Sequence, residues 1–198
     1  MEREEFGKLF EAYMAGKREE MRGKYDRIVP SGDLIYNRFD KGREMGCGEG
    51  SSVYDACLVL GDVEIGEHVW VGPFTVLDGS GGKVKIGDWV SVAAGTSIYT
   101  HDSTKNYLSG GKNPFEQGAV TIGDHCVIGT MCMIGCGVTV GDHCVIAAHS
   151  FVNKDIPAYS IAAGIPAKVI GRVAVREDGQ VAFEYDSAKD EGKTGKEA

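Results

Sequence analysis

Residues 120–146 read VTIGDHCVIGTMCMIGCGVTVGDHCVI, and within this stretch an aliphatic residue returns at every sixth position. A helix would repeat its apolar positions at about 3.6 residues and a one-sided strand at about two. A step of six indicates short strands that each turn one aliphatic side chain inward before the chain bends. The aliphatic positions are Ile122, Ile128, Ile134, Val140 and Ile146.

The same period extends, with two interruptions, from Val53 to Val152. The residue after each aliphatic position is usually Gly or Ala, and a small residue permits a bend. Three strands of this kind would close one triangular coil, and successive coils would stack at about 4.8 Å. The pattern therefore predicts an all-β solenoid, a parallel β-helix, whose handedness does not follow from the period. Its complete coils would be residues 63–78, 84–101, 120–137 and 138–155.

The residues before the repeat differ in composition from the repeat itself. In residues 1–30 apolar side chains recur at roughly helical spacing, which predicts a helix. Residues 33–52 are polar and rich in glycine, and we expect them to be irregular. The residues at helical spacing are Phe6, Leu9, Phe10, Tyr13 and Met14.

The residues after the repeat predict a short hairpin. The stretch VAVREDGQVAFEY, residues 173–185, has a turn signal at Asp178-Gly179 between two apolar runs. The residues that follow, DSAKDEGKTGKEA, have a composition typical of disorder. We therefore divide the chain into an N-terminal helical and irregular segment (1–52), a β-helix domain (53–172) and a C-terminal hairpin and tail (173–198).

Composition limits the classes of protein to which the chain can belong. Its 198 residues carry a net charge of −8, with a pI of about 5.1. An acidic chain of this kind is a poor match for nucleic acid or for an acidic membrane surface. No apolar run approaches the roughly 18 residues of a membrane span, and the N-terminal MEREEF lacks the features of a signal peptide. We expect a cytoplasmic protein.

The cysteines and histidines follow the period. Four of the six cysteines occupy the inward position two residues before an aliphatic one, where a free thiol packs as a small apolar group. The histidines all lie three residues after an aliphatic position, at the corners, so His125 and His143 should stack on adjacent coils. A metal site at that pair is the alternative, but no zinc spacing accompanies it, and we expect no metal. The inward cysteines are Cys57, Cys126, Cys132 and Cys144.

The longest interruption of the repeat is a loop, residues 102–118, that leaves the frame after His101. Long loops inside a compact domain are usually functional. His101 would stand at the fixed root of this loop, and a neutral imidazole can accept a proton near pH 7. The next residue, Asp102, could orient the imidazole or form an Asx turn at the start of the loop, and both alternatives remain open.

The repeat, the YTHD at residues 99–102 and the ending SFVNKDIPAYSIAAGIPAKVIG at residues 150–171 resemble the left-handed β-helix acyltransferases of the hexapeptide-repeat family. The resemblance covers about residues 53–172. It is strongest to sugar O-acetyltransferases, such as the maltose and galactoside enzymes and those that modify bacterial surface polysaccharides. It implies a left-handed coil, a homotrimer and acetyl-CoA as the acyl donor.

The resemblance also implies roles for particular residues. His101 would be the general base that takes a proton from a sugar hydroxyl, which then attacks the thioester carbonyl directly, without a covalent enzyme intermediate. Thr130 would contact the oxyanion of the tetrahedral intermediate. The coenzyme A contacts that carry over from the family are Thr130, Ala148, Asn153, Lys154 and Lys168.

The predicted coil also places the remaining candidate residues. Asp78, Tyr99 and Tyr107 lie near the corner of His101 and are candidates for binding sugar hydroxyls, although Asp78 could also be an ordinary turn residue. Thr130 and Ala148 would stack on a different corner. Since one prism cannot turn two corners toward one ligand, we expect the site to lie between subunits of the trimer.

Three other functions compete with sugar O-acetylation. The first is N-acetylation of a nucleotide-linked amino sugar by the same base and donor; the usual enzymes of that kind carry an N-terminal nucleotide-binding βαβ domain, which we do not find here. The second is a zinc lyase on the same helix, which would need a histidine pair five residues apart that the sequence lacks. The third is a scaffold without catalytic activity.

Overall fold

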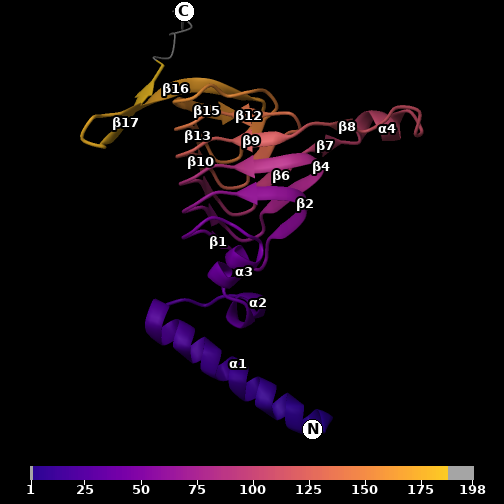
Figure 1. Cartoon of the computed structure of the whole chain (residues 1–198), viewed down its shortest axis with the longest axis vertical. Helices are drawn as coiled ribbons and strands as arrows, with labels where there is room; N and C mark the ends of the chain where they lie inside the picture. The colour runs from indigo at the N-terminus through magenta and orange to yellow at the C-terminus, as the bar shows by residue number, and fades with distance from the viewer. Residues whose placement is uncertain (1, 187–198) are drawn as a thin grey trace, which may run out of the picture.

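Short strands stacked in three parallel ladders form the body of the molecule (Figure 1). The computed structural model of the chain describes residues 2–186. Along the first ladder, Val71 pairs with Val92, Val92 with Ile128 and Ile128 with Ile146. This ladder consists of β1 (Ser52–Val53), β3 (Trp70–Val71), β5 (Ser91–Val92), β10 (Val127–Ile128), β13 (Val145–Ile146) and β15 (Ser160–Gly164).

The other two ladders share strands that bend around a corner of the stack. The first halves of β2 and β4 pair on one face and their second halves on the next. In both ladders the register again pairs one period position with another, which confirms the predicted coil boundaries. The strands are β2 (Leu58–Ile65), β4 (Val76–Ile86), β6 (Ser97–Tyr99), β9 (Val120–Ile122), β11 (Met133–Ile134), β12 (Thr139–Val140) and β14 (Phe151–Val152).

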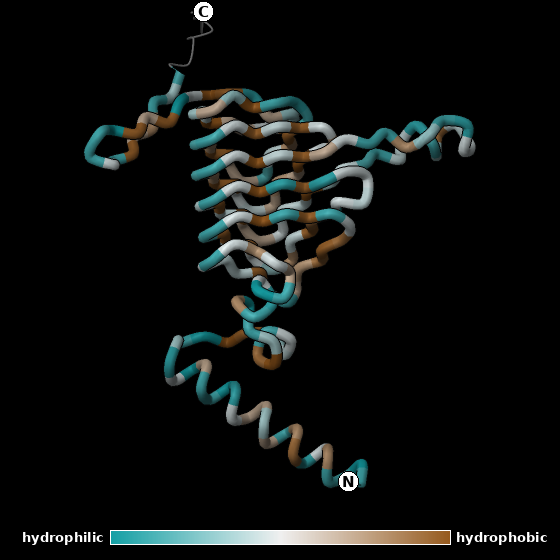
Figure 2. The backbone as a smooth tube through the Cα atoms, viewed as in Figure 1, coloured by the Kyte–Doolittle hydropathy of each residue, from teal (hydrophilic) through white to brown (hydrophobic). Residues whose placement is uncertain are grey.

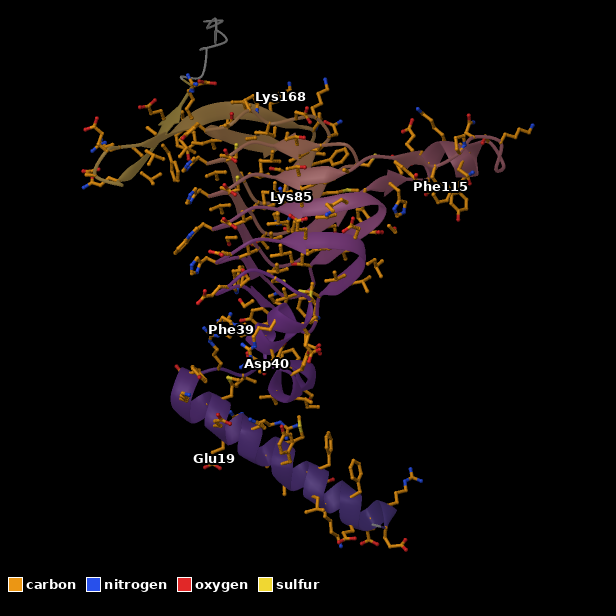
Figure 3. The ribbon with its side chains drawn as sticks, viewed as in Figure 1. Glu19, Phe39, Asp40, Lys85, Phe115 and Lys168 are labelled. Atoms are coloured by element: carbon orange, nitrogen blue, oxygen red, sulfur yellow. The ribbon has the colours of Figure 1, made fainter. Side chains whose placement is uncertain are left out.

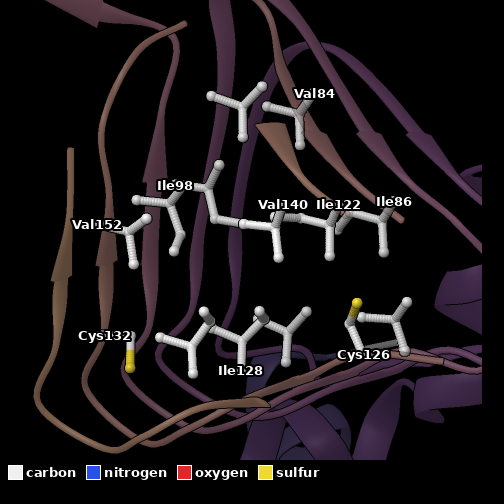
Figure 4. Packing of buried hydrophobic residues seen from close by; sticks show 14 of the residues in the cluster. Val84, Ile86, Ile98, Ile122, Cys126, Ile128, Cys132, Val140 and Val152 are labelled. Carbon is white, nitrogen blue, oxygen red and sulfur yellow. The ribbon is translucent and has the colours of Figure 1, made fainter. Parts of the chain in front are cut away.

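The aliphatic side chains of the period fill the centre of the stack (Figure 4). Ile98, Ile128 and Ile134 have no exposed surface. The inward cysteines pack beside them: Cys126, Cys132 and Cys144 are buried, as predicted, and Cys57 is half-buried. Burial raises the pKa of Cys132, and the hydrogen bond with Cys144 and burial raise the pKa of Cys126, so both stay thiols at neutral pH.

Hydrophilic turns recur one above another along an edge of the stack (Figure 2). Asp124 Oδ1 accepts the N–H of Asp88 at 2.8 Å, and Asp142 Oδ1 accepts the N–H of Asp124 at 2.9 Å. Beside them the rings of His125 and His143 stack at 4.6 Å, as predicted. Within residues 2–186 no three His, Cys, Asp or Glu side chains come together as metal ligands would. The rings of His125 and His143 join their two coils by direct contact.

The N-terminal segment is helical over more of its length than predicted. Its helices are α1 (Arg3–Tyr25), α2 (Ser31–Ile35) and α3 (Arg38–Glu44). The expectation of an irregular chain over 33–52 is therefore wrong for α2 and α3. Asn37 caps α3 by accepting the N–H of Phe39 at 2.8 Å, and Leu34 of α2 is buried. None of the described helices is both long and apolar enough to cross a membrane.

The long loop and the C-terminal residues also have secondary structure. The loop is an arm that projects from the stack, with β7 (His101–Asp102) and β8 (Glu116–Gln117) paired at its root and α4 (Thr104–Leu108) farther out (Figure 1). The hairpin predicted after the repeat is present: β16 (Ala167–Val175) pairs with β17 (Val181–Tyr185). The disorder predicted for the tail falls almost wholly on residues 187–198, outside the described residues.

Candidate active site

The arm leaves the stack at the corner that follows β6, and His101 stands at its root. His101 is held by backbone pairing, because it lies opposite Gln117 in the antiparallel pair of β7 and β8. Its side chain is 28% exposed. The backbone of His101 is therefore held in place while part of its imidazole is open to solvent, so a bound substrate could come within hydrogen-bond reach of the ring.

A carboxylate and a hydroxyl face one nitrogen of this imidazole. Asp78 Oδ2 lies 3.7 Å from His101 Nδ1, and Ser80 Oγ lies 3.5 Å from the same nitrogen. Asp78 is only 4% exposed, and its carboxylate accepts hydrogen bonds from both the N–H and the hydroxyl of Ser80. Asp78 thus turns toward the histidine and Ser80 and offers little surface to a sugar.

Two aromatic side chains flank the imidazole. Phe115 lies on the returning side of the arm (Figure 3). Its ring stacks on the imidazole of His101 with ring centres 6.1 Å apart and planes inclined by 16°. Tyr99 meets it edge-on at 6.3 Å. Tyr107 packs against Phe115 at 6.4 Å but does not reach His101. Phe115 and Tyr99 thus lie beside the imidazole, and Tyr107 reaches it only through Phe115.

An open groove of about 290 Å³ runs beside His101. Its far wall comes from the next two coils, where Met133 and Phe151 point outward. Cys136, at the corner above, adds a thiol that we did not predict for the site, since nothing in the period marks it. The lining residues are Tyr99, His101, Asp102, Ser103, Thr104, Met133, Gly135, Cys136 and Phe151. A further cavity, between the N-terminal helices and the first coil, contains none of the predicted site residues.

Asp102 lies next to His101 but directs its carboxylate elsewhere. Its Oδ1 accepts the N–H of Thr104 at 2.7 Å, which is the Asx turn of the second alternative. The hydrogen bond from Thr104 lowers the pKa of this exposed carboxyl. The structure therefore gives Asp78, and not Asp102, the place beside the imidazole nitrogen.

The residues predicted to hold coenzyme A fall into two groups. Asn153 and Lys154 follow β14, at the same corner as His101 and two coils farther along the stack. Thr130 and Ala148 lie on another corner, where the carbonyl of Thr130 accepts the N–H of His149 at 2.9 Å. Lys168 is on β16 at the far end of the stack (Figure 3). All five are exposed, and Thr130 and Ala148 lie on a different corner from Asn153 and Lys154.

Known proteins resemble this chain in sequence and in fold. The family described as bacterial transferase hexapeptide (six repeats) matches residues 119–154. A dTDP-4-amino-4,6-dideoxy-D-glucose acyltransferase from Escherichia coli is 30% identical over 146 residues, which are 66% of this chain and 76% of the relative. A hexapeptide-repeat acetyltransferase from Vibrio cholerae, solved with acetyl coenzyme A, is 25% identical, with a TM-score of 0.54 over 80% of this chain and 86% of that one.

Galactoside acetyltransferase, solved with coenzyme A, has the same fold, with a TM-score of 0.60, 24% identity and coverage of 80% of this chain and 82% of that one. Taken with the repeat and its stacked register, these matches place the chain in the bacterial hexapeptide-repeat transferase family. Within that family the chain is an acyltransferase.

Proposed function

We propose that the chain transfers an acetyl group from acetyl-CoA to a hydroxyl group of a sugar, with His101 as the general base. The observation that carries the proposal is the position of His101, whose imidazole is fixed at the root of the arm and opens to the groove. The Vibrio cholerae relative was solved with the same donor. The left-handed sense of the coil, which the family resemblance implies, belongs to the same proposal.

The reaction needs one proton acceptor and one site for developing charge. His101 Nε2 removes the proton as the hydroxyl oxygen attacks the thioester carbonyl carbon. Thr130 supports the negative charge on the former carbonyl oxygen. The carbon–sulfur bond then breaks, the imidazolium returns its proton to the sulfur, and coenzyme A leaves as a thiol. No covalent enzyme intermediate forms, so none of the cysteines acts as a nucleophile.

The donor lies between two subunits of a homotrimer in this proposal. His101 and Lys154 belong to one corner of the stack, whereas Thr130 and Ala148 belong to another. A single donor molecule can touch both corners only where two copies of the chain stand side by side, as cyclic symmetry allows. Lys154 and Lys168 would supply positive charge to the phosphates of coenzyme A. Tyr99 would contact the acceptor beside His101.

The second candidate is N-acylation of an amino sugar linked to dTDP, because the Escherichia coli relative acts on such a sugar. The same base and donor would serve an amino group. Either acceptor is bound at the same groove, so the product must decide between them.

A coenzyme A release assay separates the two candidates. We expect thiol release from acetyl-CoA with a neutral saccharide or lipid-linked glycan in a panel that also contains dTDP-4-amino-4,6-dideoxy-D-glucose. The product should be an ester that mild base cleaves. A base-stable amide, formed only with the amino sugar, would support the second candidate. If no acceptor in the panel gave thiol release faster than the protein-free control, both candidate functions would be contradicted.

A further inference from the structure

The insertion between the two halves of β4, residues 79–83, lies against the root of the arm. Gly81 donates its N–H to Thr100 Oγ1 at 2.9 Å, and that hydroxyl donates to the Asp78 carbonyl at 2.7 Å. A Cβ on Gly81 would lie 2.5 Å from the carbonyl oxygen of Thr100 and 2.7 Å from Cβ of His101. Any larger residue at position 81 would collide with Thr100 and His101. The absence of a side chain on Gly81 therefore lets the insertion pack directly against His101.

This contact places two acceptor groups in front of His101 Nδ1. The hydroxyl of Ser80 donates its hydrogen to Asp78 Oδ1, so the lone pairs of the Ser80 oxygen are free to face the imidazole, 3.5 Å away. The other carboxylate oxygen, Asp78 Oδ2, faces the same nitrogen at 3.7 Å. Both groups therefore favour a hydrogen on Nδ1.

The Asp78 carboxylate is ionised at neutral pH. Burial raises its pKa, but the hydrogen bonds from Ser80 and the nearby His101 outweigh burial, and the net change is downward. An ionised carboxylate can only accept a hydrogen bond. Among the described residues, Asp78 has the only carboxylate within 4 Å of an imidazole nitrogen of His101. The carboxylate of Asp102 binds the N–H of Thr104 instead. The other neighbours of the ring, Tyr99 and Phe115, are aromatic.

We propose that Asp78 and Ser80 are positioning residues that hold His101 in the tautomer with its hydrogen on Nδ1, which leaves Nε2 as the proton acceptor. The two distances exceed hydrogen-bond length, as contacts around a catalytic base often do before substrate is bound. The tautomer is a property of the free protein. Only its kinetic consequence rests on the proposed acetyl transfer.

Nitrogen-15 NMR of the intact protein tests the tautomer without substrate, since a ring nitrogen that carries hydrogen and one that does not have well-separated chemical shifts. We expect neutral His101 to show hydrogen on Nδ1. In Asp78→Asn the new amide can donate to Nδ1, so the population should move toward hydrogen on Nε2, and Ser80→Ala should produce a smaller change in the same direction. Asp62→Asn is the matched control, because Asp62 is exposed and pairs with Lys83.

Two results would overturn the inference. One is a wild-type His101 with hydrogen on Nε2. The other is an unchanged tautomer in both Asp78→Asn and Ser80→Ala, while Asp102→Asn alters it. Ser80 is exposed, so Ser80→Ala should fold even if Asp78→Asn does not.

Kinetics then separate this inference from the proposed function. Asp78→Asn should lower kcat on the order of 10²-fold, the lower end of a general-base contribution, with KM for acetyl-CoA unchanged. If the wild type transfers no acetyl group yet the tautomer responds as expected, the proposed function fails and the inference stands. If the wild type is active, His101→Ala is not, and Asp78→Asn changes neither tautomer nor kcat, the inference alone fails.

Discussion

His101→Ala is expected to lower kcat for acetyl transfer by about 10²–10⁴-fold, the usual contribution of a general base. The attacking hydroxyl is a weak nucleophile while it keeps its proton, and within the described residues no other imidazole lines the groove. The KM for acetyl-CoA should stay close to the wild-type value, because the residues proposed to hold coenzyme A remain. Steady-state thiol release with the best acceptor from the panel measures both constants.

A histidine on another corner provides the control for this substitution. His125 stacks on His143 far from the arm, so His125→Ala removes a ring of the same size without touching the groove. Its kcat should equal that of the wild type. The assignment of the base would be contradicted if His101→Ala kept more than a tenth of wild-type kcat, or if both substitutions reduced it equally.

Ile128→Ala is expected to lower the free energy of unfolding by about 2–5 kcal/mol. Ile128 has no exposed surface and sits between Val92 and Ile146 of the neighbouring coils. Stacked coils have fixed spacing, so the surrounding side chains cannot close the space that the lost methyl groups leave. Denaturant unfolding followed by circular dichroism measures the change.

The preceding residue on the same strand is the matched control. Val127 points outward and is 46% exposed, so Val127→Ala should cost less than about 1 kcal/mol. Equal losses for the two substitutions would show that the strand does not alternate between core and surface. That result would contradict the packing that the six-residue period predicts.

Most of the fold could be predicted because the repeat acts through local rules. Each aliphatic position, such as Ile122 or Ile134, sets its own coil in register with the next, and no long-range information is needed. Helices α2 and α3 were not predicted, because helices of only five and seven residues are too short to show a 3.6-residue apolar period. Their stability depends on the Asn37 cap and on contacts such as burial of Leu34, which appear only in the folded chain.

The candidate site was only partly predictable. His101 could be found because it stands where the period breaks, and Tyr99 because it lies two residues before. The partner of His101 could not, because the direction of the Asp78 side chain depends on how the five-residue insertion at 79–83 folds back. From the sequence alone, Asp102 was an equally plausible partner for the imidazole of His101. In the structure its carboxylate instead accepts a hydrogen bond from the backbone N–H of Thr104, two residues ahead.

Mixed trimers test the central claim, a groove shared between chains, most directly. In a ring of three, a mixture of His101→Ala and Thr130→Phe subunits rebuilds one intact groove in every mixed trimer, because one subunit supplies His101 and its neighbour supplies Thr130. Equal amounts, unfolded and refolded together, should therefore recover about a quarter of wild-type thiol release, whereas each variant alone should show almost none. If the mixture is no more active than the two variants measured apart, although native mass spectrometry finds mixed trimers, the two residues do not act across subunits.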